Sequence, residues 1–172
     1  MSYWLVGANW DASGDQTQRF IEDNIWQNGY DHKYTNIVNQ MKPGDKIAIK
    51  STYTKSNDIP FENNGETVSV MKIKVTGTVI ENLSDGKNVK VKWDEPDERE
   101  WYMFTGRNTI WNITPRDDKD DWMKEELIKF VFDGQEQDYN RFINDPYWSD
   151  RYSISAEEEK MEDCIPYTQE NF

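Results

Sequence analysis

The sequence predicts an α+β protein in which a small β-barrel of about six strands is flanked by short helices. Runs of alternating apolar and polar residues recur through the middle of the chain, and turn residues separate them at short intervals. Two segments before these runs and one after them instead place apolar residues at helical spacing. Short connections favour a barrel over βαβ units, which need longer crossovers.

The N-terminal part is predicted to contain one strand and two short helices. Residues 3–9 (YWLVGAN) form a brief apolar run typical of a buried strand. Residues 16–26 and 34–41 each place apolar residues on one helical face. The second helix is expected to end before the turn Pro43-Gly44-Asp45, because proline and glycine do not continue a helix.

The central part is predicted to supply the other strands. They cover residues 46–51, 67–82, 88–94, 100–104 and 109–113. Gly77 interrupts the longest run, where a bend or bulge is expected. The same alternation places Trp4, Trp101 and Trp111 in the core. Residues 121–132 then show helical spacing.

The last part of the chain differs in pattern and in charge. Net charge is −13, but residues 1–116 hold 16 acidic and 14 basic residues, whereas residues 117–172 hold 17 and 6. Beyond Asp133 no regular period is sustained. We therefore expect a domain over 1–132 and a weakly packed acidic extension or linker over 133–172. The N-terminal part is close to neutral, so its electrostatic attraction for a polyanion is weak.

Most catalytic and metal-binding arrangements lack the residues they need. His32 and Cys164 are the only histidine and cysteine, which nearly excludes a zinc site and rules out an intramolecular disulfide. The chain has no phosphate-binding loop motif. We expect no enzyme, no cofactor and no metal, with a carboxylate-based hydrolase as a distant alternative. A signal peptide and an apolar stretch of about 20 residues are missing, so a cytoplasmic protein without membrane contact is expected.

Several segments together resemble a known family. The strand opening Tyr3-Trp4-Leu5, the turn Met41-Lys42-Pro43-Gly44-Asp45 and the strand Val75-Thr76-Gly77-Thr78-Val79 follow one another as in the EVE domain of the PUA-like superfamily. Asn24-Ile25-Trp26 also resembles the helix-to-tryptophan junction of the YTH domain, where the tryptophan belongs to an aromatic cage for a methylated base.

The resemblance is closest to the N-terminal domains of McrB-type, modification-dependent restriction GTPases and their AAA+ relatives. YWLVGANWD, RFIEDNIWQNGYDHKY and REWYMFTGRNTIW look like segments of that module, and IPYTQENF resembles the junction that leads into the ATPase core. The resemblance implies a PUA-like, EVE-type barrel that recognises a modified base in double-stranded DNA. A nuclease subunit would then be engaged through an ATPase part outside this chain. The modified base is left open among 5-methylcytosine, hydroxymethylcytosine, their glucosylated forms and N6-methyladenine.

The resemblance also implies which residues form the site. A modified base flipped out of the duplex needs aromatic faces and hydrogen-bonding groups around it. The expected base-binding residues are Trp26, Trp10, Asn9, Ser51 and Tyr53, with Trp26 the first candidate for the cage. The expected contacts to the nucleic-acid backbone are Lys50, Lys55 and Arg107. Each has a structural alternative: the tryptophans as core residues, Ser51 as a turn residue, Tyr53 as a surface residue and the cations as solvated charges.

Two other functions remain open from the sequence. The same fold could bind RNA, and a preference for the 2′-hydroxyl would distinguish the two nucleic acids. The acidic C-terminal third could instead belong to a protein-interaction or regulatory domain, because acidic segments often contact basic partners.

Overall fold

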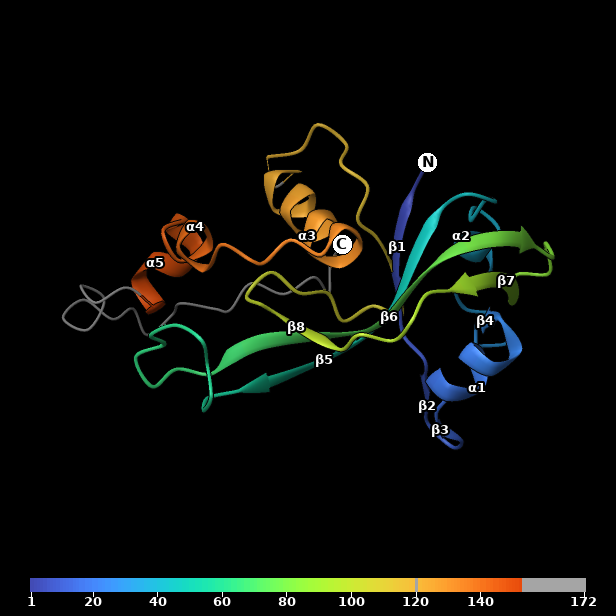
Figure 1. Cartoon of the computed structure of the whole chain (residues 1–172), viewed down its shortest axis with the longest axis horizontal. Coiled ribbons are helices and arrows are strands. Elements are labelled where there is room, and N and C mark those ends of the chain that lie inside the picture. Colours follow the sequence, from blue (N-terminus) through green and yellow to red (C-terminus); the bar gives the residue numbers. More distant parts are fainter. Residues whose placement is uncertain (120, 153–172) are drawn as a thin grey trace.

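The computed structural model describes residues 1–119 and 121–152 as a curled β-sheet with short helices around it (Figure 1). The strands are β1 Tyr3–Val6, β2 Asn9–Trp10, β3 Gly14–Asp15, β4 Ile25–Gln27, β5 Lys46–Lys55, β6 Val68–Asn82, β7 Asn88–Trp93, β8 Arg99–Tyr102 and β9 Ile110–Asn112. The helices are α1 Thr17–Asp23, α2 Thr35–Val38, α3 Asp121–Asp133, α4 Tyr139–Ile143 and α5 Pro146–Tyr152.

The main sheet is an open half-barrel. Its path runs β4-β7-β6-β5-β1-β9, and β8 pairs with β6 beside that path. Only β1 and β5 are parallel, and the other pairs are antiparallel. The α+β class and the curled sheet with short helices are therefore confirmed, whereas the sheet has two open ends, β4 and β9, in place of a closed barrel.

The long β5–β6 hairpin links two hydrophobic clusters. In Figure 1 it runs along the molecule, with α4 and α5 at the left, α3 near the middle, and α1 and α2 at the right. Strand β1 is buried on both faces, because Leu5 packs in the cluster with α3–α5 while Trp4 and Val6 pack in the cluster with α1 and α2. The predicted core positions of Trp4, Trp101 and Trp111 are confirmed, with at most 3% of each residue exposed.

The first helix is shorter than predicted. Helix α1 ends at Asp23, and Asn24 takes a left-handed conformation with φ 56°. Asparagine adopts this conformation more readily than most residues, and it commonly ends helices. The next three residues, Ile25–Gln27, form strand β4 beside β7 and not the last turn of a helix.

Gly77 has a different role from the one predicted. Its pairing with Ile47 and Trp93 is regular, and the register shifts of β6 lie elsewhere, opposite Ile49/Lys50 and between Val79 and Glu81. A Cβ atom at Gly77 would lie 2.7 Å from the carbonyl oxygen of Lys92. Gly77 therefore allows β6 and β7 to approach closely, and it produces no bulge.

The expectation of weak packing beyond Asp133 is wrong for residues 139–152. Phe142, Trp148 and Tyr152 of α4 and α5 are buried in the same cluster as Trp101 and Phe130. Helices α4 and α5 are only five and seven residues long, too short to show a sustained apolar period in the sequence. Three aromatic residues are nevertheless enough to anchor this stretch in the core. The domain boundary at 132 stays a prediction. Residues 153–172 of the expected acidic extension, with Cys164 and the IPYTQENF segment, lie outside the described residues.

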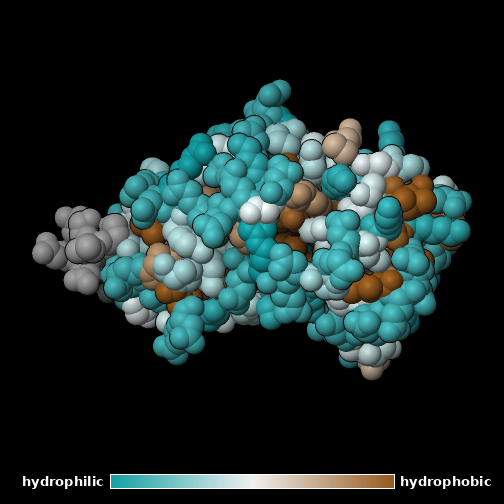
Figure 2. Space-filling view, in the orientation of Figure 1, coloured by the Kyte–Doolittle hydropathy of each residue, from teal (hydrophilic) through white to brown (hydrophobic). Residues whose placement is uncertain are grey.

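The surface in Figure 2 is mainly hydrophilic, and hydrophobic residues form small separate areas bordered by polar ones. Among the residues that the structure describes, no helix combines the length and apolar character needed to cross a membrane.

Candidate ligand-binding cavity

A cavity of about 780 Å3 opens beside the ends of β1 and β9, and we call it the Trp10 cavity. Four chain segments line it: residues 7–13, residues 27–30 without Asn28, residues 50–52, and Arg107 with Thr109. Its volume lies within the range of about 300–1,000 Å3 that is usual for small-molecule pockets. Five of the eight residues expected in the site line this one cavity, namely Asn9, Trp10, Lys50, Ser51 and Arg107.

The first wall is a tight hairpin formed by β2 and β3. Asn9 pairs with Asp15 and Trp10 with Gly14, and Gly14 has φ 79°, a conformation that favours glycine. The amide of Gly7 donates to the carbonyl oxygen of Thr109 at 2.7 Å, which joins the hairpin to the residue before β9. The hairpin thus holds Asn9 and Trp10 beside Thr109.

Trp10 is the aromatic wall of the cavity. Its ring contacts Phe20 edge to face at 6.0 Å between centroids, and the guanidinium of Arg19 lies 5.2 Å from the ring centroid. Arg19 is itself held by Gln16 and Gln27, which accept its hydrogen bonds at 2.8 and 2.9 Å. Phe20 and Arg19 therefore hold the half-buried indole, which also lines the cavity.

Trp26 does not line the cavity, so the expectation that it forms the cage is corrected. Its residue is 0% exposed within the cluster of α1 and α2, and its indole Nε1 donates to the carbonyl oxygen of Gly7 at 2.9 Å. Side chains of adjacent residues in a strand point to opposite faces. In β4 this places Trp26 in the core and Gln27 on the cavity side.

Lys50 lines the cavity, although nearly all of the residue is buried. The residue is 5% exposed, and its Nζ donates to the carbonyl oxygens of Gly106 and Asn108, both at 2.7 Å. Burial lowers the pKa of Lys50 to about 7. These two hydrogen bonds tie β5 to the turn before β9 and do not support the expected contact of Lys50 with a phosphate, which stays a prediction.

Ser51 and Thr52 continue the same wall. The hydroxyl of Thr52 donates to the carbonyl oxygen of Gly106 at 3.0 Å. The half-buried hydroxyls of Ser51 and Thr109 have no hydrogen-bond partner among residues 1–119 and 121–152. These two hydroxyl groups are available to a ligand.

Tyr53 and Lys55 lie outside the cavity, farther along β5. The phenol of Tyr53 donates to Glu100, and the ammonium of Lys55 lies 3.2 Å from the same carboxylate. Tyr102 also donates to Glu100, at 3.1 Å. The hydrogen bond from Tyr53 holds the pKa of Glu100 below its usual value. The expected stacking of Tyr53 and phosphate contact of Lys55 are not supported, since both side chains belong to this separate cluster.

Arg107 is exposed at the cavity wall, as a backbone contact requires. The lining includes two cationic residues, Lys50 and Arg107, and one carboxylate, Asp11. Although the whole chain carries −13, the charge around this cavity is thus not acidic.

The sequence interpretation missed Gln27, Gly29, Tyr30, Thr52 and Thr109. The stretch Gln27-Asn28-Gly29-Tyr30 was the available signal, because it follows Trp26 and ends in a turn. The helix predicted over residues 16–26 includes Trp26, whereas Ile25–Gln27 form a strand. The alternation of that strand, which brings Gln27 to the cavity, was therefore not recognised.

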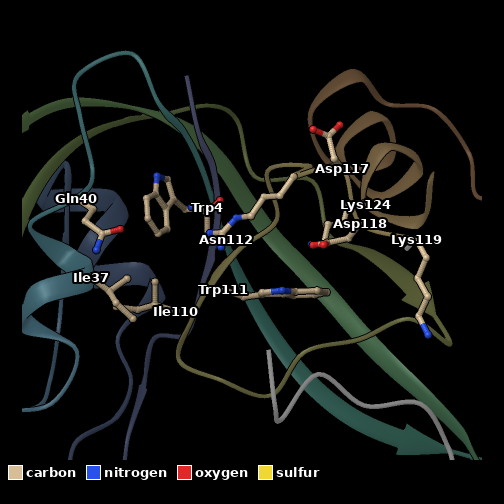
Figure 3. A pocket seen from close by; sticks show the side chains of 11 residues that line it. Trp4, Ile37, Gln40, Ile110, Trp111, Asn112, Asp117, Asp118, Lys119 and Lys124 are labelled. Carbon is tan, nitrogen blue, oxygen red and sulfur yellow. The ribbon is translucent and has the colours of Figure 1, made fainter. Parts of the chain in front are cut away.

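A second cavity, of about 770 Å3, lies between the start of β1 and α3. Figure 3 shows Trp4, Ile37, Gln40 and Ile110 on one side of it and Asp117, Asp118, Lys119 and Lys124 on the other. Trp4 and Trp111 are only 1% and 3% exposed, so neither ring face is open to stacking. Its lining holds Arg116, Lys119 and Lys124 beside Asp117 and Asp118, so the buried rings, and not the charge, make it less suited to a base than the Trp10 cavity.

No protein-family model matches this chain, and no curated protein sequence matches it. Within residues 1–119 and 121–152, no three His, Cys, Asp or Glu side chains form a group that could hold a metal ion.

Proposed function

We propose that this chain recognises a modified base flipped out of double-stranded DNA into the Trp10 cavity, as the specificity domain of a modification-dependent restriction system. The observation that carries the proposal is the meeting of Trp10, Asn9, Ser51 and Arg107 around one cavity of about 780 Å3. The curled sheet with short helices supports a PUA-like, EVE-type fold. The motor and nuclease of such a system would belong to other segments or chains.

Each part of the cavity suits one step of base flipping. Extrusion of a base costs a few kcal/mol of lost stacking and pairing. Stacking on an aromatic ring returns about 1–3 kcal/mol per base, and Trp10 offers such a ring. The side chains of Asn9 and Ser51 can bond the base edge, while Arg107 can contact the phosphate beside the extruded nucleotide.

The test is fluorescence anisotropy with duplexes that differ in one modified base, at about 50 mM salt because few phosphate contacts are offered. We expect a preference for one modified duplex that weakens about tenfold or more in Trp10→Ala, through loss of the stacking energy. Trp10→Phe should retain most of the affinity. Tyr147→Ala, which changes an exposed aromatic residue outside the cavity, is the control.

Three results would contradict the proposal. Binding to no duplex would remove its basis, and equal binding to modified and unmodified duplexes would remove base recognition. Tighter binding to a modified RNA strand than to the matching DNA would assign the cavity to RNA, because RNA differs there by its 2′-hydroxyl groups.

A further inference from the structure

We propose that the Trp10 cavity selects a base whose substituent carries hydroxyl groups, such as a hydroxymethyl group or a hexose attached to it, over a methylated base. The inference rests on the proposed function and specifies its substrate class. It follows from the polar groups of the lining, from the small aromatic surface and from the cavity volume.

Several hydrogen-bonding groups of the lining have no partner of their own. Among the residues that the structure describes, the indole Nε1 of Trp10 and the hydroxyls of Ser51 and Thr109 make no hydrogen bond. All three residues are half-buried, so bulk water hydrates them less freely than a surface group. A methyl group facing them would leave donors and acceptors unpaired, which costs free energy in a site shielded from water.

Lys50 adds a donor that is already oriented. An ammonium group carries three N–H donors, and two of them are directed at the carbonyl oxygens of Gly106 and Asn108. No other described residue accepts the third. Because Lys50 lines the cavity, this donor is available to a ligand oxygen, and hydrogen bonds from a charged donor are stronger than neutral ones.

The aromatic surface is too small for a methyl cage. Of the described residues that line the cavity, only Trp10 and Tyr30 are aromatic, and Tyr30 is 43% exposed. One well-held ring can stack on a base, but a cage that encloses a methyl group needs further apolar faces. The β5 part of the lining instead consists of Lys50, Ser51 and Thr52.

The volume agrees with a substituent larger than a methyl group. At the roughly 30 Å3 that one water molecule occupies in the liquid, the approximately nine non-hydrogen atoms of methylcytosine fill at most about 270 Å3. The same bound gives about 630 Å3 for a cytosine that carries a hexose on its hydroxymethyl group. A cavity of about 780 Å3 would be mostly empty around the first base and mostly filled by the second.

The experiment compares one duplex sequence carrying cytosine, 5-methylcytosine, 5-hydroxymethylcytosine or its glucosylated form at a single position, with an N6-methyladenine duplex as a further arm. The hydroxylated forms should bind at least about fivefold more tightly than 5-methylcytosine, because one additional net hydrogen bond changes affinity by about that factor. Ser51→Ala and Thr109→Val should each reduce affinity for the hydroxylated forms about fivefold and affect 5-methylcytosine less than about twofold. Thr54→Ala, an exposed β5 position outside the cavity, is the control for Ser51→Ala.

The outcomes separate the inference from the function on which it rests. Tightest binding to 5-methylcytosine or N6-methyladenine would overturn the inference and leave modified-base recognition standing. Equal losses on every duplex in Ser51→Ala and Thr109→Val would overturn it too, since the hydroxyls would then act on folding or on the backbone. Binding to none of the duplexes would remove both.

Discussion

Gly29 lies against the indole of Trp10, so closely that a Cβ atom at position 29 would be 2.7 Å from Nε1 and 2.8 Å from Cε2. Gly29 therefore leaves the space in which the Trp10 ring rests. Gly29→Ala should displace the ring without removing it. We expect about a tenfold loss of affinity for the preferred duplex, comparable with the loss of one stacking contact. Anisotropy measures the affinity, and near-ultraviolet circular dichroism follows the displaced indole.

A double-mutant cycle with Trp10→Ala tests the cause of this loss. If Gly29→Ala acts through the ring, the double variant should bind as weakly as Trp10→Ala alone, because substitutions of residues in contact do not have additive effects on the free energy of binding. Additive losses would show that Gly29 contributes through another route, such as a direct contact with the ligand.

Trp26 is predicted to hold the cavity indirectly. Trp26→Phe keeps an aromatic core residue but leaves the carbonyl oxygen of Gly7 without its 2.9 Å hydrogen bond. Gly7 is half-buried, so leaving its carbonyl oxygen unpaired should lower the free energy of unfolding in urea by about 1 kcal/mol, the lower end of the cost for a buried group. Affinity should fall less than in Trp10→Ala. Unchanged stability would show that water replaces the indole as the donor to Gly7.

Most strands, the helix over 121–133 and the core tryptophans follow from the sequence because each is encoded by a local apolar period. The cavity is encoded only in part. Asn9 and Trp10 form the short strand β2, whereas Ser51 lies inside β5, which continues to Lys55 beyond the predicted end at 51. All three were identified through a family resemblance. Trp26 lies in the core because α1 ends at Asp23 and Ile25–Gln27 form a strand, which the helical spacing of residues 16–26 did not predict.

Other features depend on contacts between distant residues and had no local signal. Lys50 is buried because Gly106 and Asn108, more than 50 positions away, supply carbonyl oxygens to its ammonium group. Tyr53 and Lys55 lie outside the cavity and contact Glu100, which belongs to another strand. An alternating pattern identifies faces of a strand, but it does not identify these partners.

Lys50 should make the stability of the protein depend on pH. Burial depresses its folded pKa to about 7, below the unfolded value of about 10.5. Between these values the unfolded chain binds more protons, so stability from this group rises as pH increases from 7 toward 10.5. The difference in unfolding free energy between wild type and Lys50→Met should therefore shift in favour of wild type from pH 6 to pH 9. A difference that stays constant would show that the two carbonyl oxygens keep Lys50 charged.

The same proton should affect binding in the opposite direction. A neutral amine keeps only two N–H donors, and Gly106 and Asn108 already accept two. The neutral nitrogen can still accept a hydrogen bond from a ligand hydroxyl, but this bond is weaker than one from a charged donor. Affinity for a hydroxylated base should therefore fall as pH rises through about 7. His32→Gln serves as the control, because His32 is the only histidine and does not line the cavity. Loss of the pH dependence in His32→Gln would assign it to the histidine.

The Glu100 cluster should contribute to stability and not to binding. Hydrogen bonds from Tyr53, Lys55 and Tyr102 hold the pKa of Glu100 below its usual value. The stabilisation of the folded state by the Glu100 carboxylate is therefore complete above the unfolded pKa, and it is lost as pH falls through the lower, folded pKa. Glu100→Gln should cost about 1.5 kcal/mol at pH 7, as expected for a hydrogen-bonded charge, and progressively less in acid. Urea unfolding at several pH values measures this change in stability.

Tyr53→Phe and Lys55→Ala should leave DNA affinity within about twofold, because neither side chain lines the Trp10 cavity, whose interactions set that affinity. A larger loss in either variant would extend the binding surface along β5 as far as Glu100.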